Sequence, residues 1–384
     1  MRRWHLITGE YPPAFGGVAD YSQLVATGLA RAGDQVSVWA PEADGIPPAE
    51  DGIEVNRIPS RFGLGALRLI GRKIERHPGT LLVQYVPHSF GLKAMNLPFC
   101  LWLMAHRRRP VWLMFHEVAV AFTIRQPLRH NLIALINRAM ATVATLAADR
   151  IFVSTNQWER LLRPLVGPRR AIEWLPVPSN IPFVNDLAQI SRVRALVVPA
   201  DSVLVGHFSS ARDATMATTL AESITPAFAQ RPRAHLMLLG DGSENLRRRI
   251  IDASPAVGPR ISATGRLTAT EMSFSLSASD LMFQPYPDGL STRRTSSMAT
   301  LAHHRALLTT RGFATETFWD SENAIALAPT HDIDAIVRSL IRLIDDTAER
   351  SRLATAGAQL YTHRFDVAHT IAALRTREAV QVRE

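Results

Sequence analysis

The feature that most constrains the fold is a repeated alternation of short apolar runs with segments long enough to form helices. In the first forty residues, WHLITGEY is followed by the loop PPAFGGVA, the helical pattern DYSQLVATGLARAG and the run QVSVWAP. This order of strand, glycine-bearing loop, helix and strand predicts a βαβ unit. The apolar runs TLLVQYV, PVWLMFHEV and RIFVST follow at helix-length intervals and predict a parallel sheet covered on both faces.

A second series of the same kind begins near residue 203 with VLVGHFSS and continues through AHLMLLGDG, SDLMFQPY, RALLTT and AIALAP. A chain of 384 residues also exceeds the size at which one hydrophobic core stops growing. We therefore expect an α/β protein with two Rossmann-like domains, 1–178 and 203–364, joined by a linker at 179–202. A C-terminal helix at about 365–384 is expected to pack back on the first domain. Because open α/β sheets bind ligands at strand carboxyl ends, we expect a ligand cleft between the domains.

Composition narrows the setting. The single cysteine, Cys100, excludes an internal disulfide and a zinc cluster of several cysteines, and its apolar neighbours predict a core position. The chain has no apolar run of transmembrane length and no signal-peptide pattern at its start, so we expect a soluble, cytoplasmic protein.

The net charge of +9 comes almost entirely from arginine, since only Lys73 and Lys93 are lysines. Arginine favours bidentate contact with phosphate, although genome composition alone can produce the same bias. A basic balance is compatible with nucleic acid, an anionic membrane or a phosphorylated small molecule.

The segment DGLSTRRTSSMA, residues 288–299, joins a turn to the start of a predicted helix. Helix amino termini present unpaired N–H groups and the positive end of the dipole. Gly289, Ser291 and Thr292 would then lie where phosphate oxygens or sugar hydroxyls are received. The alternative is an ordinary Ser/Thr-capped helix with solvated arginines.

The order of these pieces resembles the family 4 glycosyltransferases of the two-domain GT-B fold. The resemblance spans nearly the whole chain and rests on the front segment from YPPAFGGVADYS to VWAP, and on FHEV, ADRIFVST, VGHFSSARD, LMLLGDGSE, ATGRLTATEMSFSLSASDLMFQPY and the segment at 288–299. It implies a retaining enzyme that uses a nucleotide-diphosphate sugar as donor, with no metal and no other cofactor. The implied acceptor is a glycan, a lipid-linked sugar or a small polar molecule.

The resemblance also assigns donor-binding positions in the second half. His207 and Arg212 occupy the places of an arginine and a lysine in the family's second-domain loop. Asp288 and Ser296 occupy the places of two glutamates, of which the first contacts the donor sugar and the second the ribose. Aspartate keeps the carboxylate on a shorter arm, whereas serine removes it, so nucleoside recognition is expected to be reorganised, weakened or absent. Glu316 follows a glycine-bearing turn where the family often has an acidic residue near donor groups.

In the first half, Gly16 and Gly17 let backbone N–H groups approach a ligand. The resemblance implies that this loop faces the donor phosphates or the acceptor. A simple turn is the alternative. His116 ends an apolar strand, where α/β sheets place functional side chains, and it matches a family histidine that touches the donor sugar. The assigned site is thus catalytic His116 and Asp288 with donor-binding Gly16, Gly17, His207, Arg212, Gly289, Leu290, Ser291, Thr292, Arg294, Ser296 and Glu316.

Three further patterns bear on partners and alternatives. Arg293 and Arg294 could supply compensating anion contacts, but helical spacing would keep them from facing the same way. Asp332 and Asp334 form a D-x-D string that reads as a helix N-cap rather than a metal site. The basic stretches at 68–76 and 104–112 either contact acidic lipid headgroups or are solvated faces.

No aromatic interleaving or recognition motif indicates nucleic-acid binding. The alternative function is a GT-B-like binding or scaffolding protein without transfer activity, because the second motif glutamate is missing and His207 replaces an arginine.

Overall fold

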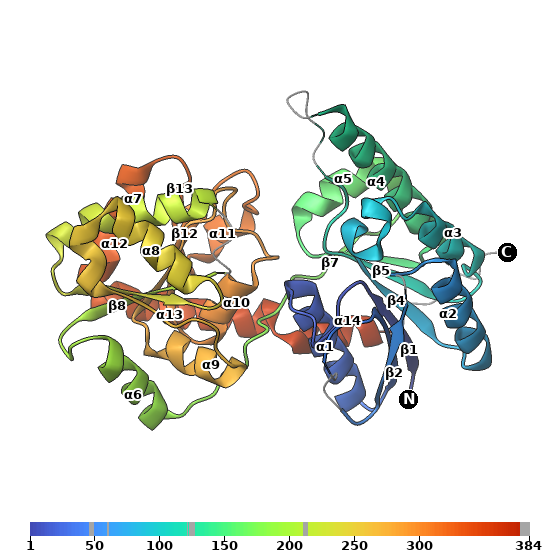
Figure 1. Ribbon diagram of the computed structural model, residues 1–384, viewed down its shortest axis with the longest axis horizontal. Coiled ribbons are helices and arrows are strands. Elements are labelled where there is room, and N and C mark those ends of the chain that lie inside the picture. The colour runs from blue at the N-terminus through green and yellow to red at the C-terminus, as the bar shows by residue number, and fades with distance from the viewer. Residues whose placement is uncertain (46–49, 60, 121, 123–126, 210–213, 377–384) are drawn as a thin grey trace. The chain divides into compact units, whose positions relative to one another are not determined.

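The computed structural model describes residues 1–45, 50–59, 61–120, 122, 127–209 and 214–376, which divide into two compact units. The first comprises Met1–Val177 and Val367–Glu384, and the second Pro178–Asp366. Each unit contains one parallel sheet with helices on its faces (Figure 1). The predicted α/β class with two Rossmann-like domains is confirmed.

The first unit has a seven-stranded sheet in the order β3-β2-β1-β4-β5-β6-β7, and all its pairings are parallel. Its strands are β1 (Arg3–Thr8), β2 (Gln35–Pro41), β3 (Ile53–Ile58), β4 (Thr80–Tyr85), β5 (Val111–Phe115), β6 (Arg150–Val153) and β7 (Glu173–Trp174). Its helices are α1 (Gly17–Arg31), α2 (Leu64–Arg76), α3 (Leu97–Ala105), α4 (Leu128–Ala147), α5 (Asn156–Val166) and α14 (Val367–Arg375). Successive residues of β1 alternate between the faces: Leu6 packs in the core beneath α1 and α14, and Ile7 in the core beneath α2, α3 and α4.

The C-terminal helix α14 completes this unit, lying beside α1 (Figure 1). A Cβ on Gly28 of α1 would approach Ile371 to 2.6 Å, so glycine allows the two helices to pack closely. Arg150 donates to the carbonyl of Ala373 at 3.0 Å, and Arg375 pairs with the buried Asp34 at 3.1 Å. Distant parts of the sequence therefore share one core. Cys100, as predicted, is buried, and it lies in the core on the other face of the sheet, beneath α2, α3 and α4.

The second unit has a six-stranded sheet in the order β10-β9-β8-β11-β12-β13, again parallel throughout. Its strands are β8 (Val203–Phe208), β9 (Ala234–Leu239), β10 (Ile261–Ala263), β11 (Leu281–Gln284), β12 (Ala306–Arg311) and β13 (Ala326–Pro329). Its helices are α6 (Leu187–Val197), α7 (Ala214–Gln230), α8 (Ser243–Ala253), α9 (Ala269–Ala278), α10 (Thr295–Ala302), α11 (Phe318–Glu322), α12 (Ile333–Asp345) and α13 (Thr347–Leu360).

One element differs from the expected linker at 179–202. Leu187–Val197 forms helix α6, and Asp186 caps it by accepting hydrogen bonds from the amides of Ala188 and Gln189, both at 3.1 Å. Arg194 of α6 anchors the helix to the second unit through the carbonyl of Ala278 at 2.9 Å and through Asp280. The segment is therefore a packed helix of the second unit. The cap at Asp186 fixes where this helix begins, and the weak hydrophobic periodicity of the segment did not reveal that start.

Candidate active site

The turn between β11 and α10 is held in a conformation that requires glycine. Gly289 has a φ of +89°, and a Cβ there would lie 2.2 Å from the amide nitrogen of Gly312 and 2.3 Å from the hydroxyl of Thr315. The Gly312 loop therefore fits directly against the Gly289 backbone. The carbonyl of Asp288 also accepts a hydrogen bond from the amide of Ala314 at 2.9 Å. These contacts fix the backbone on which the predicted anion site depends.

The amides of this turn, however, already have partners within the protein. The Gly289 amide donates to the carbonyl of Tyr286 at 3.1 Å, and the Leu290 amide to that of Thr310 at 2.8 Å. The amide and the hydroxyl of Thr292 both donate to Glu316 Oε1, at 3.1 and 2.8 Å. The expected phosphate contacts of these groups are thus replaced by internal hydrogen bonds.

Glu316 is the anchor of this turn. It is 6% exposed, and its second oxygen accepts a hydrogen bond from Trp319 Nε1 at 3.1 Å. A carboxylate with three donors in a buried position is stabilised where it stands. In this conformation Glu316 holds the turn in place.

Both arginines of this segment lie before the helix and not within it, as their expected helical spacing would require. Helix α10 starts at Thr295, and Arg294 is its N-cap residue. Because Arg293 and Arg294 precede the helix, helical spacing does not separate them. Arg293 Nη2 lies 3.3 Å from Asp288 Oδ2, and Arg294 forms a closer ion pair with Asp288 Oδ1. The prediction that the two arginines point apart is wrong for this reason.

This cluster has more positive than negative charge, with two guanidinium groups around one carboxylate. The three side chains are between 18% and 29% exposed, so the charges are partly shielded from water. Among the described residues, Arg294 Nε and the buried hydroxyl of Ser291 have no hydrogen-bond partner. No side chain caps the first turn of α10. A helix start whose N-cap side chain makes no capping hydrogen bond, next to two arginines, favours an anion.

Ser296, which the sequence resemblance matched to a ribose-binding glutamate, is held by contacts within the unit. Its hydroxyl lies 2.7 Å from the hydroxyl of Tyr286, which lies 2.9 Å from that of Ser297. The guanidinium of Arg294 sits 4.5 Å from the centre of the Tyr286 ring, a cation–π contact. Sequence reasoning missed Tyr286, because no spacing rule links a strand-end tyrosine to a serine ten positions later.

His207 is the penultimate residue of β8 and is 1% exposed. Its Nδ1 donates to the carbonyl of Phe283 at 2.8 Å, and its Nε2 lies 2.9 Å from the hydroxyl of Ser209. Burial lowers the pKa of His207 to about 4, so the ring is neutral at neutral pH. Both ring nitrogens are engaged, and this leaves no ring atom to contact a donor phosphate. Arg212 lies outside the described residues.

In the first unit, His116 directly follows β5 and is 8% exposed. Its Nε2 donates to Gln84 Oε1 at 2.8 Å, which leaves Nδ1 as the acceptor nitrogen of the neutral ring. The ring packs edge-on against Tyr21 of α1, with centroids 4.7 Å apart. Burial lowers the pKa of His116 to about 4. His116 is therefore a neutral, oriented side chain at the carboxyl edge of the sheet.

The glycine loop before α1 has an acidic neighbour. A Cβ on Gly16 would lie 2.4 Å from Glu10 Oε2, whereas one on Gly17 meets nothing within 4 Å. The Glu10 carboxylate thus lies directly against the Gly16 backbone. A carboxylate at this point repels a phosphate and accepts hydrogen bonds from hydroxyl groups. Of the two ligands expected for this loop, a sugar acceptor suits it better than a diphosphate.

Asp332 is the N-cap of α12 and accepts a hydrogen bond from the amide of Ala335 at 2.8 Å, as predicted. Within the described ranges, no group of three or more His, Cys, Asp or Glu side chains could hold a metal ion. Across the same ranges, none of the helices is both long enough and apolar enough to span a bilayer.

Comparisons with known proteins agree with this architecture. The family model described as a glycosyl transferase 4-like domain matches residues 16–178, and the model for glycosyl transferases group 1 matches residues 201–346. No curated protein sequence matches the chain.

Three of the similar solved structures illustrate the shared fold. Sucrose-phosphate synthase (tll1590) from Thermosynechococcus elongatus is 16% identical with a TM-score of 0.71, and a glycosyltransferase from Rickettsia africae ESF-5 is 11% identical with a TM-score of 0.74; each match covers 97% of both chains. Anabaena Alr3699/HepE, solved with UDP and glucose, is 15% identical with a TM-score of 0.67, over 97% of this chain and 98% of that one. With both units matched by glycosyltransferase models and the whole chain by GT-B structures, the protein belongs to the family 4-like, group 1 glycosyltransferases of the GT-B fold.

Proposed function

We propose that the protein transfers a sugar from a nucleoside-diphosphate sugar to a glycan, a lipid-linked sugar or a small polar acceptor, with retention of the anomeric configuration. The observation that carries this proposal is the pair of guanidinium groups, Arg293 and Arg294, immediately before the uncapped start of α10. Family membership supplies the reaction class, and the solved complex of a similar protein with UDP supports a uridine nucleotide as the first donor to test.

In the proposed reaction, the bond between the anomeric carbon and the phosphate oxygen breaks while the acceptor oxygen bonds to the same face of that carbon. The acceptor proton passes to the departing phosphate oxygen, so no side chain has to act as the base. Negative charge grows on the diphosphate as the bond breaks, and Arg293 and Arg294 stabilise it electrostatically. Asp288 holds the two guanidiniums in position, and this role differs from direct contact with the donor sugar.

Arginine can neutralise the diphosphate without a metal, and we propose that the reaction needs none. Transfer measured with excess EDTA should equal transfer measured with magnesium. A requirement for a divalent cation would reject this part of the proposal.

The first-unit residues are assigned to the sugars. We propose that neutral His116 accepts a hydrogen bond from a donor-sugar hydroxyl through Nδ1 and that Glu10 accepts one from the acceptor. His116→Ala and Glu10→Gln should then slow transfer while leaving the dissociation constant for the bare nucleotide diphosphate unchanged. An equal loss of nucleotide affinity in either variant would contradict this assignment.

Three residues that were expected to bind the sugar donor instead have partners within the protein, and this favours a second candidate function. Asp288 is paired with two arginines, Ser296 with Tyr286, and both nitrogens of His207 are occupied. A GT-B protein with these positions engaged could bind a ligand without transferring a sugar.

The same experiment separates the two functions. UDP, GDP and ADP sugars are titrated into the full-length protein, and both melting temperature and release of nucleoside diphosphate are recorded. Binding together with release supports transfer or hydrolysis of a donor, whereas binding without release for any donor and acceptor supports the binding protein. If no nucleotide sugar alters the melting temperature, and Arg293→Gln with Arg294→Gln changes nothing, the glycosyltransferase proposal fails.

A further inference from the structure

The loop between β12 and α11 carries a phenylalanine that the protein leaves uncovered. The side chain of Phe313 is 77% exposed, and it makes no ring contact with any residue that the structure describes. The next aromatic side chains along the chain are packed, because Phe318 and Trp319 contact Phe365 at centroid distances of 6.2 and 5.5 Å. An aromatic ring left in water is unfavourable unless a ligand covers it.

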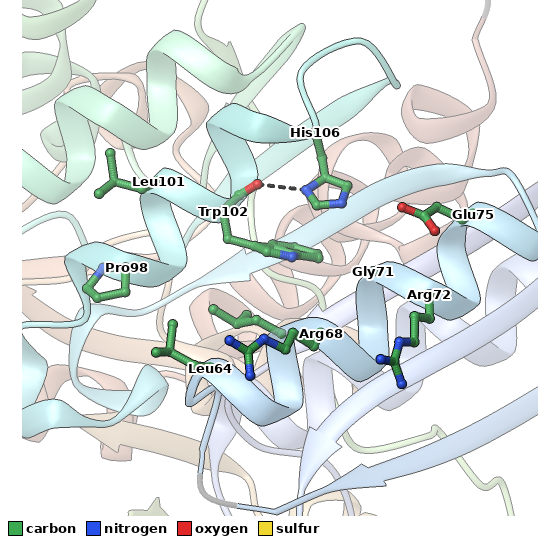
Figure 2. A pocket seen from close by; sticks show the side chains of 10 residues that line it. Leu64, Arg68, Gly71, Arg72, Glu75, Pro98, Leu101, Trp102 and His106 are labelled. Atoms are coloured by element: carbon green, nitrogen blue, oxygen red, sulfur yellow. Dashed lines mark hydrogen bonds between the residues drawn. The ribbon is translucent and has the colours of Figure 1, made fainter.

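Exposure alone does not mark a site, since single apolar side chains are common on protein surfaces. Leu64 and Leu101 are 65% and 54% exposed on helices α2 and α3, where they line a groove in the first unit (Figure 2). Phe313 differs from them in its place in the fold. It follows β12, so it lies in a loop at the carboxyl edge of the second sheet, where open α/β sheets bind their ligands.

The backbone on both sides of Phe313 is held in place. Gly312 packs so closely on the neighbouring turn that a Cβ there would lie 2.4 Å from the carbonyl oxygen of Asp288. The Ala314 amide donates to the same oxygen at 2.9 Å, and Ala314 is 3% exposed. The Gly312 amide also donates to the Thr315 hydroxyl at 3.0 Å. The loop therefore presents the Phe313 ring from a fixed backbone, which lowers the entropy lost when a ligand binds.

The neighbouring turn is the one that carries the proposed diphosphate site. Strands β11 and β12 pair in parallel, and the loops that follow them meet at the carbonyl of Asp288. The carboxylate of Asp288 pairs with Arg293 and Arg294. A loop with an exposed apolar ring is thus joined to a turn with two guanidinium groups. This combination matches a ligand in which an anionic group is bonded to a ring with an apolar face.

A nucleoside-diphosphate sugar has two parts that could stack on Phe313, the base and the transferred sugar. The sugar is bonded directly to the diphosphate, whereas the ribose separates the base from it. A diphosphate at Arg293 and Arg294 therefore brings the sugar closer to the adjoining loop than the base. The C–H groups on one face of a pyranose are apolar and slightly positive, and they complement the negative face of an aromatic ring.

We propose that Phe313 is the platform on which the apolar face of the transferred pyranose stacks. This inference rests on the proposed function, because it takes the donor diphosphate to lie at the arginine pair. Phe313 is a binding residue in this scheme and takes no part in breaking or forming bonds. It contributes affinity for the sugar part of the donor and none for the nucleotide part.

The test compares UDP-glucose with UDP, each titrated by calorimetry into the full-length protein without acceptor. The two ligands differ by the glucose residue, so a change in the ratio of their dissociation constants reports on the sugar. We expect Phe313→Ala to weaken UDP-glucose binding by about three- to tenfold and to leave UDP binding unchanged. Phe313→Tyr keeps the ring face and should bind both ligands as the wild type does. If the wild type binds neither ligand, the comparison is repeated with GDP-mannose and GDP and with ADP-glucose and ADP.

Phe183→Ala is the matched control. Phe183 belongs to the same unit and is 47% exposed, and its ring stacks on His304, just after the end of α10, with centroids 5.4 Å apart. The proposed diphosphate site precedes the start of that helix, so the control should change no dissociation constant. Phe313→Ala should also unfold at the same urea concentration as the wild type, because surface side chains contribute little to stability.

Equal weakening of the nucleotide and the nucleotide sugar in Phe313→Ala would place the ring against the base or the ribose and overturn the platform. Unchanged binding of both, an equal loss in Phe183→Ala, or a lower urea midpoint of Phe313→Ala would also overturn it. If the wild type binds none of the three pairs, the proposed function fails and the platform fails with it. Binding by the wild type that Phe313→Ala leaves unaltered rejects the platform alone.

Discussion

The hydroxyl of Tyr286 lies 2.7 Å from that of Ser296, so the residue that replaces a ribose-binding glutamate is tied to the strand end it follows. Tyr286 is 4% exposed and also contacts Ser297 and Arg294. It therefore links the start of α10 to the arginines that precede it. The Ser296 hydroxyl is therefore held within the unit, at the position that the sequence resemblance matches to a ribose-binding carboxylate.

Replacing Tyr286 should destabilise the start of α10. Tyr286→Phe leaves the buried Ser297 hydroxyl without its partner, and we expect the free energy of unfolding to fall by about 1 to 3 kcal/mol. Ser296→Ala should cost less, because the bond between Tyr286 and Ser297 survives. Urea denaturation of both variants measures their free energies of unfolding. A larger decrease in Ser296→Ala than in Tyr286→Phe would contradict the prediction.

The arginine pair should control affinity for the donor diphosphate. A charge-assisted hydrogen bond contributes about 1.5 to 3 kcal/mol, so Arg293→Gln and Arg294→Gln should each weaken UDP binding by about tenfold or more. Calorimetric titration with UDP gives the comparison. Arg231→Gln is the control, since that arginine pairs with Asp345 elsewhere in the unit. Similar losses in the control and the two site variants would show a general charge effect and remove the assigned role.

The turn at Gly289 should tolerate no side chain. Gly289→Ala adds a Cβ at 2.2 Å from a backbone nitrogen in a positive-φ conformation, and we expect a loss of more than about 2 kcal/mol of stability, with UDP binding lost as well. Gly265→Ala is the matched control in the same unit, because Gly265 has a φ of +65° but no atom within 4 Å of the new Cβ. The control should cost only about 1 to 2 kcal/mol. Equal costs for the two would show that the packing against Gly312 contributes nothing.

The buried histidines should make stability depend on pH. His116 and His207 each have a pKa of about 4 in the folded chain, and about 6.5 is the ordinary value for the unfolded one. Between pH 4 and pH 6.5 the unfolded chain binds more protons than the folded one. The contribution of these two histidines to the free energy of unfolding is therefore fully present above about pH 6.5 and is lost as the pH falls towards 4. The slope is up to about 1.4 kcal/mol per pH unit for each histidine.

Urea unfolding across this range, compared with the His116→Gln and His207→Gln variants, isolates each contribution because the carboxylates titrate equally in all three proteins. In each variant, the free energy of unfolding should depend less steeply on pH, by about the contribution of one histidine. An unchanged slope in both would mean that these rings are not kept neutral by burial.

The sequence predicts the two sheets well, because buried parallel strands are continuous apolar runs and the intervening helices are amphipathic. It does not predict α6, whose start depends on the cap at Asp186 rather than on periodicity. It also treats Arg293 and Arg294 as part of a helix. The chain instead makes a turn before α10, and this turn brings both arginines to Asp288.

The site residues divide in the same way. Gly289 can be singled out from its motif, because the motif itself is a backbone requirement. Partners brought together by tertiary folding cannot be singled out in this way. The contacts of Glu316 with Thr292 and of Glu10 with Gly16 are ones that no local spacing encodes.

The position of α14 in the first unit has a consequence for how the protein is made. The chain enters the second unit after Val177 and returns at Val367, so the first unit lacks α14 until the whole second unit has been synthesised. The second unit, by contrast, is continuous and can finish folding as soon as it has emerged from the ribosome. The usual order, in which the N-terminal domain is completed first, is therefore reversed for the final step. A chain released early, before residue 367, would carry a finished second unit beside an unfinished first one.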